Sequence, residues 1–308
     1  MRIVFMGSAD FGICSLETLM EYHKVVGVVS TPAKPKGRGR KTVESPISSY
    51  ARNRNIEPIL TPQNLKDPQL AKTLSDLKAD IFVVVAFRIL PETIFSIPPL
   101  GTINIHASLL PSYRGAAPIQ RAIESGEKET GVTIFRIDKG IDTGELILQK
   151  KVQIGDQETT PELYMRLSRL GAQALVESIN MLQNGTIHPL KQDNSNATTA
   201  PKLSKKEAKI DWSEPNINIF NKIRAFKPFP GTSMVMNGKR IAVEWAYPLD
   251  ENTSKKPGTV IKSGSDFIDV QCGKGVLRII RIKPEGKREM SIHDFILGTD
   301  IPEGILLN

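Results

Sequence analysis

The chain has 308 residues, of which 40% are hydrophobic and 6% aromatic, a composition typical of a globular protein long enough for two domains. It has two distant cysteines, no signal peptide and no apolar run approaching the ~18–20 residues of a membrane helix, which together favour a cytoplasmic protein without disulfides or a membrane partner. The net charge of +8 favours a polyanionic partner such as nucleic acid, although a solvated basic surface gives the same excess.

The first part of the chain alternates apolar, strand-like stretches with helix-like ones. We expect strands at 2–7, 24–30, 80–86, 101–107, 131–138 and 144–154, and helices at 9–22, 45–54, 68–77 and 160–185. This alternation predicts an α/β fold with a doubly wound, mostly parallel sheet covered on both faces. The turn at 7–12 has Ala9 where dinucleotide-binding loops carry glycine, so the sequence favours a plain strand-to-helix turn.

Residues 189–206 are polar, contain two prolines and lack periodicity, so we expect a linker between a first domain at 1–188 and a second at 207–308. After a helix at 216–226, the second domain has several strand-like stretches and a hairpin signal at Asn237-Gly238. This pattern predicts a small β-barrel or sheet with basic character.

A polar pair occupies the end of the strand expected at 101–107. Asn104 and His106 are two residues apart, so they share a face of the strand, at the sheet edge where parallel folds bind ligands. The glycine-rich loop that carries Asp138 and Asp142 could aim a carboxylate at this edge, although both are also common turn formers. A lone histidine is more often structural, but an Asn, His and Asp together supply oxyanion donors and a proton-transfer group. Without an activated Ser or Cys beside them, the nucleophile should belong to the substrate.

The stretches "NIHASLLPSYRGAAPIQRAI" and "GVTIFRIDKGIDTGELI" resemble the folate-dependent formyltransferases, whose catalytic residues match Asn104, His106 and Asp142. The stretches "PKLSKKEAKIDWSEP" and "IRAFKPFPG" and the basic loop "TPAKPKGRGRKTVESPI" are similar to those members of the family that act on methionyl-tRNA. The glycinamide ribonucleotide members share the Asn/His/Asp core but have no such second domain.

The resemblance implies a formyltransferase-type Rossmann-like domain followed by an OB-like barrel, acting as a monomer. It implies transfer from 10-formyltetrahydrofolate to the methionine amino group of initiator tRNA, without a metal. Asn104 and His106 would stabilise the oxyanion, and Asp142 would assist proton transfer.

The resemblance also implies two sets of binding residues. The folate set comprises Phe87, Arg88, Ile89, Leu90, Ser108, Leu109, Leu110, Pro111 and Asp138. The tRNA set comprises Arg38, Arg40, Lys41, Lys202, Lys205 and Lys206. The stretch "AFRILP" at 86–91 departs from the family pattern, because it is one residue shorter than the Ala-Tyr-Gly-x-Ile-Leu-Pro of the tRNA-specific members.

Two alternatives stay open at this point. One is an N-formyltransferase for a small amine, such as a nucleotide-linked amino sugar, and the basic loop speaks against it. The other is a nucleic-acid-binding protein with an inert α/β domain, and the Asn104, His106 and Asp142 set speaks against that.

Overall fold

The computed structural model describes residues 1–36, 41–251 and 253–308. The chain forms two compact units. The first unit contains residues 1–118, 129–153 and 164–200, and the second contains residues 119–128, 154–163 and 201–308.

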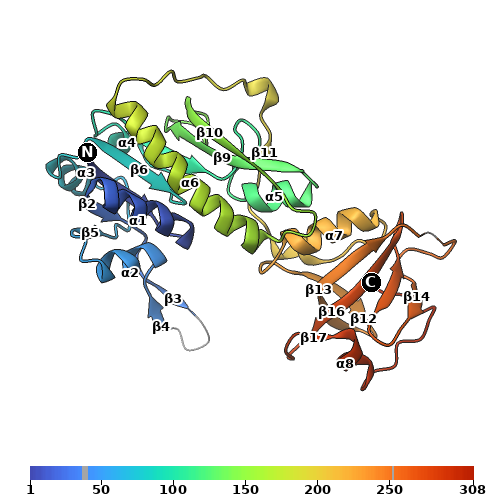
Figure 1. Ribbon diagram of the computed structural model, residues 1–308. Coiled ribbons are helices and arrows are strands. Elements are labelled where there is room, and N and C mark those ends of the chain that lie inside the picture. The colour runs from blue at the N-terminus through green and yellow to red at the C-terminus, as the bar shows by residue number, and fades with distance from the viewer. Residues whose placement is uncertain (37–40, 252) are drawn as a thin grey trace. The chain divides into compact units, whose positions relative to one another are not determined.

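The first unit is built on one twisted sheet with the strand order β10-β9-β7-β6-β1-β2-β5 among the described residues (Figure 1). Its strands are β1 (Arg2–Gly7), β2 (Lys24–Val29), β5 (Ile59–Leu60), β6 (Ile81–Val85), β7 (Thr102–His106), β9 (Glu129–Arg136) and β10 (Leu146–Gln153). Strands β5, β2, β1, β6 and β7 are parallel, whereas β9 runs antiparallel to both β7 and β10. The predicted mostly parallel α/β sheet is therefore confirmed.

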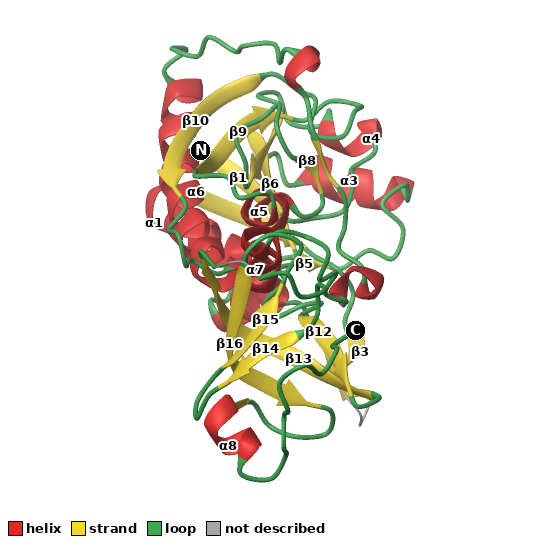
Figure 2. Ribbon diagram, turned by 90° about the vertical axis from the view of Figure 1, so that its right-hand side faces the viewer, coloured by secondary structure: helices red, strands yellow, loops and turns green. Residues whose placement is uncertain are grey.

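Helices cover both faces of this sheet (Figure 2). They are α1 (Ile13–Tyr22), α2 (Pro46–Asn53), α3 (Pro68–Asp76), α4 (Glu92–Phe95) and the long α6 (Thr160–Gln183). The side chains of β1 alternate between the faces, so that Val4 and Met6 join the cluster that contains Leu70 and Leu74 of α3. Within the described residues, no helix is long and apolar enough to cross a membrane.

The helix expected from residue 9 begins instead with a short 3₁₀ turn, η1 (Asp10–Gly12). The Tyr164 hydroxyl accepts the backbone N–H of Phe11 at 2.8 Å, and the Ser168 hydroxyl donates to the Phe11 carbonyl at 2.7 Å. Burial, followed by a hydrogen bond to Asp10, raises the pKa of Tyr164, so this hydroxyl keeps its proton. The N–H and carbonyl of Phe11 therefore bond to side chains of α6 and not within a regular helix.

The second unit carries an antiparallel sheet with the strand order β12-β13-β16-β15-β14 in the part that the structure describes. Its strands are β12 (Thr232–Met236), β13 (Lys239–Leu249), β14 (Val260–Ser263), β15 (Ile268–Gln271), β16 (Val276–Pro284) and β17 (Met290–Ser291). Its helices include α5 (Pro118–Glu124, almost all of it in this unit), α7 (Asn216–Ala225) and α8 (Ile292–Ile296). The Asn237-Gly238 turn joins β12 to β13, as the sequence predicts.

Residues 304–308 close this sheet. Val260 of β14 donates to the carbonyl of Ile305 and accepts from the N–H of Gly304. At the other end of the segment, Asn308 and Val235 of β12 exchange two backbone hydrogen bonds. The segment thus bonds to both outer strands, which gives the unit its barrel character.

Arg224 of α7 is a buried anchor of the second unit. Its guanidinium donates to the carbonyls of Gly155 and Glu158 and to Asn221 Oδ1, and burial lowers its pKa. The hydroxyl of Thr160 also donates to the carbonyl of Ala225 at 2.6 Å. These bonds explain why residues 154–163 pack with α7 in this unit.

The buried thiol of Cys272 makes a first testable prediction. Cys272 is 1% exposed, and burial raises its pKa to about 12, so the reactive thiolate is roughly 10⁻⁴ of the population at pH 8. We expect iodoacetamide at pH 8 to modify Cys14, which is partly exposed, and to leave Cys272 unmodified until urea unfolds the protein. Mass spectrometry of a Cys14→Ser variant isolates the second site. Rapid labelling of that variant without urea would contradict the burial described here.

Candidate active site

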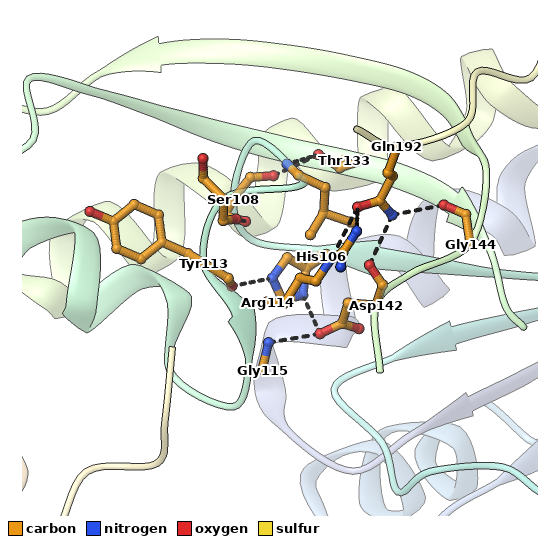
Figure 3. Close-up of polar contacts among 11 residues, drawn as sticks. His106, Ser108, Tyr113, Arg114, Gly115, Thr133, Asp142, Gly144 and Gln192 are labelled. Atoms are coloured by element: carbon orange, nitrogen blue, oxygen red, sulfur yellow. Dashed lines mark hydrogen bonds and ion pairs between the residues drawn. The ribbon is translucent and has the colours of Figure 1, made fainter. Parts of the chain in front are cut away.

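His106 is the last residue of β7, an inner strand of the sheet, and its side chain is buried. Its Nε2 lies 2.8 Å from the carbonyl oxygen of Tyr113 (Figure 3). Because a carbonyl can only accept, Nε2 carries the proton and donates it. The other ring nitrogen, Nδ1, lies 3.6 Å from Oδ2 of Asp142. The sheet therefore brings together the predicted His106 and Asp142.

Asp142 lies on the loop between β9 and β10 and has a left-handed backbone, with φ at +54°. Its Oδ2 accepts the backbone N–H of Gly115 at 2.9 Å, and the carboxylate is 15% exposed. A left-handed backbone is costly for any residue other than glycine and persists where the surroundings hold it in place. The sequence indicated the glycine-rich loop but not this conformation at Asp142.

Asn104 lies on the same strand and pairs with Val84 of β6 and Phe135 of β9. Its Oδ1 is buried and has no hydrogen-bond partner within the described residues. An unpaired buried amide oxygen is costly, which points to a bound group as its partner. The same amide carries N–H donors on Nδ2. Asn104 therefore offers both a donor and an acceptor beside His106.

The loop that follows His106 is held firmly by two side chains of β9 and β10. Thr133 donates its hydroxyl to the carbonyl of Ser108 at 2.6 Å and accepts the backbone N–H of Leu110 at 3.1 Å. Gln149 donates to the carbonyl of Leu110 at 2.8 Å and to Thr133 at 2.9 Å. The Ser108 hydroxyl bonds within the loop to the carbonyl of Ser112. The loop that includes Leu109 and Pro111 thus has a fixed shape next to the histidine.

Two further loops carry the remaining residues of the predicted folate set. Arg88 donates to the carbonyls of Pro62 and Gln63 and lies over the ring of Phe87, and burial lowers its pKa. Leu90 is buried, whereas Ile89 is 74% exposed.

Asp138 organises the third loop. Its Oδ1 accepts from the backbone N–H of Gly140 and from the hydroxyl of Thr143. The carboxylate is thus used within the 138–143 loop.

Comparison with known proteins identifies the family. The family described as Formyl transferase matches residues 1–179, and the family described as Formyl transferase, C-terminal domain matches residues 202–300. The chain belongs to the formyl transferase family. The resemblance inferred from the sequence motifs is confirmed.

Full-length relatives extend this result. The chain is 41% identical to a protein named methionyl-tRNA formyltransferase from Caldanaerobacter subterraneus subsp. tengcongensis, over 100% of both chains. It is 42% identical to a protein of the same name from Marinobacter nauticus, over 97% of this chain and 96% of the relative.

Two solved structures share the fold at lower identity. The N-formyltransferase of Helicobacter canadensis in complex with folinic acid and dTDP-3-aminofucose gives a TM-score of 0.68 at 22% identity, over 92% of this chain and 98% of that chain. HypX of Aquifex aeolicus in complex with tetrahydrofolic acid gives 0.63 at 18% identity, over 97% of this chain and 47% of that one.

One contact beside Asp142 was not predicted from the sequence. Gln192, in the stretch expected to be a linker, donates to the carbonyls of Asp142 at 2.8 Å and of Gly144 at 2.7 Å. The same stretch forms β11 (Thr199–Ala200), which pairs with β8 (Arg114–Gly115). No periodicity marks such contacts, since each one depends on a single side chain or a two-residue strand.

The basic residues of the predicted tRNA set fall into two groups. Lys202, Lys205 and Lys206 are exposed on the second unit, the latter two on η3 (Lys205–Ala208). Arg38 and Arg40 lie outside the described residues, and Lys41 is described only as the first backbone position of β4 (Lys41–Val43).

The turn η3 is closed by a capping box between Ser204 and Glu207. Burial alone would raise the pKa of Glu207, but hydrogen bonds from Arg121 and Ser204 lower it, so the carboxylate stays ionised. The box therefore holds the short basic turn in a defined shape. Within the described ranges, no group of three or more His, Cys, Asp or Glu side chains is arranged to hold a metal ion.

Proposed function

We propose that this chain transfers the formyl group of 10-formyltetrahydrofolate to the α-amino group of methionine on initiator tRNA, as a cytoplasmic monomer that supplies formylmethionyl-tRNA for translation initiation. The observation that carries the proposal is the full-length similarity, at about 41% identity, to proteins named methionyl-tRNA formyltransferase. The similarity includes both family regions, 1–179 and 202–300.

The reaction needs no nucleophile from the protein. The neutral amine of methionine attacks the formyl carbon and forms a C–N bond, which creates a tetrahedral centre with a negatively charged oxygen. The bond from that carbon to the folate nitrogen then breaks, the folate nitrogen takes a proton, and the amine loses one. The protein must stabilise the oxyanion and move this proton.

Asn104 and His106 are the proposed oxyanion donors. The Asn104 amide can donate from Nδ2, while its buried Oδ1 can accept an N–H of the attacking amine. On His106, Nε2–H is engaged by the Tyr113 carbonyl, which leaves Nδ1 for the reaction. With both nitrogens protonated, Nδ1–H becomes the second donor and its charge lies beside Asp142.

Asp142 is proposed to orient His106 and to assist proton transfer. The gap of 3.6 Å between its Oδ2 and His106 Nδ1 exceeds a hydrogen bond, so a reacting group or a water can bridge the two atoms. The N–H of Gly115 fixes the same oxygen from the other side. The carboxylate is thereby held in place to relay the proton between the amine and the folate nitrogen.

The folate donor is proposed to bind along the loops at 87–90, 108–111 and 138–142. The bonds of Thr133 and Gln149 pre-shape the central loop, which suits recognition of a flat pterin by backbone groups and apolar walls. The side chain of Arg88 is used to anchor its own loop on residues 62–63, so we expect that loop to contact folate through its backbone.

Each region of the chain is proposed to have its own role: residues 1–188 catalyse the transfer, 189–206 connect the domains and 207–308 bind tRNA. The basic loop at 34–41 is proposed to reach the acceptor stem through Arg38, Arg40 and Lys41. The second unit's contribution begins with the exposed lysines beside η3, where charge can meet phosphate.

These lysines support a quantitative prediction. Replacing Lys202, Lys205 and Lys206 with alanine should weaken tRNA binding and reduce the slope of log K against log[salt] by up to roughly 2–3, since each phosphate contact contributes about 0.7–0.9. The turnover number of this variant at saturating tRNA should equal that of the wild type. Replacing Lys66 and Lys72, two exposed lysines of the first unit, with alanine is the matched control. An unchanged salt slope in the triple variant would argue against these contacts.

Formylation of aminoacyl-tRNA is the direct test of the proposed function. We expect transfer from 10-formyltetrahydrofolate to methionyl initiator tRNA and not to methionyl elongator tRNA. Transfer to neither tRNA, with folate still bound, would favour a small-amine acceptor instead. The N-formyltransferase bound to dTDP-3-aminofucose is only 22% identical to this chain. That similarity shows a shared fold and does not indicate that this chain acts on an amino sugar.

A further inference from the structure

The side-chain amide of Gln192 is fully engaged in the first unit. Its Nε2 donates to the carbonyl of Asp142 at 2.8 Å and to the carbonyl of Gly144 at 2.7 Å (Figure 3). Its Oε1 accepts from Nε of Arg114 at 3.1 Å and from a terminal nitrogen of the same guanidinium at 2.6 Å. The amide therefore links the loop of Asp142 to Arg114, and rotating it would break both connections.

The position of Asp142 depends on such support. Its φ of +54° is costly for a side-chain-bearing residue, and the backbone keeps this conformation only where neighbouring groups hold it. Gln192 holds the carbonyl of Asp142 itself and that of Gly144, two residues further along. The backbone held in this way aims Oδ2 at Gly115 and His106.

The stretch that carries Gln192 also supports the other partner of His106. The hydroxyl of Thr198 accepts the backbone N–H of Tyr113 at 2.9 Å, and its carbonyl accepts the N–H of Arg114. Tyr113, whose carbonyl bonds His106, likewise has a left-handed backbone, with φ at +62°. Both groups that adjoin the imidazole are thus held by residues 192–198.

We propose that Gln192 is a positioning residue for formyl transfer, which acts through Asp142 on His106 without contacting the substrates. This inference rests on the proposed function. A shift of about 1 Å in a catalytic group can cost roughly 10²-fold in rate, so a side chain that fixes the Asp142 backbone controls turnover.

The test replaces the donor nitrogen Nε2 of Gln192 with an oxygen, which can only accept hydrogen bonds when ionised. Gln192→Glu keeps an oxygen for Arg114 but places another against the carbonyls of Asp142 and Gly144, which repels the loop. We expect kcat to fall about 10- to 100-fold, with KM for either substrate within about 3-fold. Gln192→Ala, which adds no charge, should lower kcat in the same way. The matched control is Gln173→Glu, the same amide-to-acid change at an exposed residue of α6, which should keep wild-type kcat.

A double-mutant cycle separates positioning from a general structural role. If Gln192 acts through Asp142, adding Gln192→Glu to Asp142→Asn should lower kcat by no more than about 3-fold further. Equal losses in both backgrounds, or full activity of both single Gln192 variants, would overturn the proposal.

The His106 ring provides a readout that needs no turnover. The chain has four histidines, and the imidazole resonances of His106 should shift in Gln192→Glu but not in Gln173→Glu. Unchanged resonances would overturn the positioning role even if the wild type formylated no tRNA. Absence of formylation by the wild type, in contrast, would count against the proposed function alone.

Discussion

Replacing His106 with alanine is expected to lower kcat for formyl transfer to methionyl initiator tRNA by about 10²–10³-fold, the usual cost of losing one oxyanion donor. KM for both substrates should change little, because the interaction is made to the charge that develops in the transition state. Single-turnover measurement with saturating donor and tRNA reports the chemical step directly.

His106 is 5% exposed, so the variant needs a check on its structure. Unaltered folate binding and an unaltered melting temperature would show that the site keeps its shape. The isosteric Asp142→Asn variant should also lose activity, since the amide can still accept from Gly115 but brings no negative charge to the histidine. A His106→Ala enzyme with wild-type kcat would exclude this imidazole from the reaction.

Replacing Arg278 with methionine is expected to lower the free energy of unfolding of the second unit by about 3 kcal/mol, the lower end for breaking a buried ion pair, because the guanidinium is partly exposed. Arg278 and Asp269 lie opposite each other on β16 and β15 and share two bonds of 2.8 Å. Asp269 is only 2% exposed, so the variant leaves its carboxylate buried without its partner. The hydrogen bond to Asp269, the largest contribution, raises the pKa of Arg278.

Urea unfolding followed by tryptophan fluorescence measures this effect selectively, since both tryptophans, Trp212 and Trp245, belong to the second unit. Arg278→Lys should lose less than methionine, because it keeps the charge but not the two-pronged bond or the stacking on Phe267. Lys128→Met removes an exposed ion pair of the same unit and should leave the transition where it is. A methionine variant as stable as the wild type would show that the pair contributes nothing.

Much of the fold follows from local patterns. The apolar runs at 24–30 and 80–86 are strands because helices bury both of their faces, and the capping Ser45 and Asp67, each followed by proline, mark where α2 and α3 begin. Asn104 and His106 could be grouped from the sequence because they lie two residues apart, on one face of one strand.

The parts that could not be predicted depend on distant contacts. β5 and β11 have two residues each, too few for any periodicity, and form only because a neighbouring strand is in place. The direction of β9 could not be predicted from the sequence either, since a buried antiparallel strand has the same apolar pattern as a parallel one. Gln192 is one polar residue in a polar stretch, and only the folded structure brings it to Asp142.

The closing segment at 304–308 has a consequence for self-association. A strand at the border of a sheet presents unpaired N–H and C=O groups, which readily recruit a strand from another molecule. Here Val235 of β12 bonds to Asn308 and Ser233 bonds to Ile210, while Val260 of β14 bonds to Gly304 and Ile305. Removing the segment would therefore expose backbone groups of Val260 in β14 and of Val235 in β12. We expect the shortened protein to aggregate while its active site stays intact.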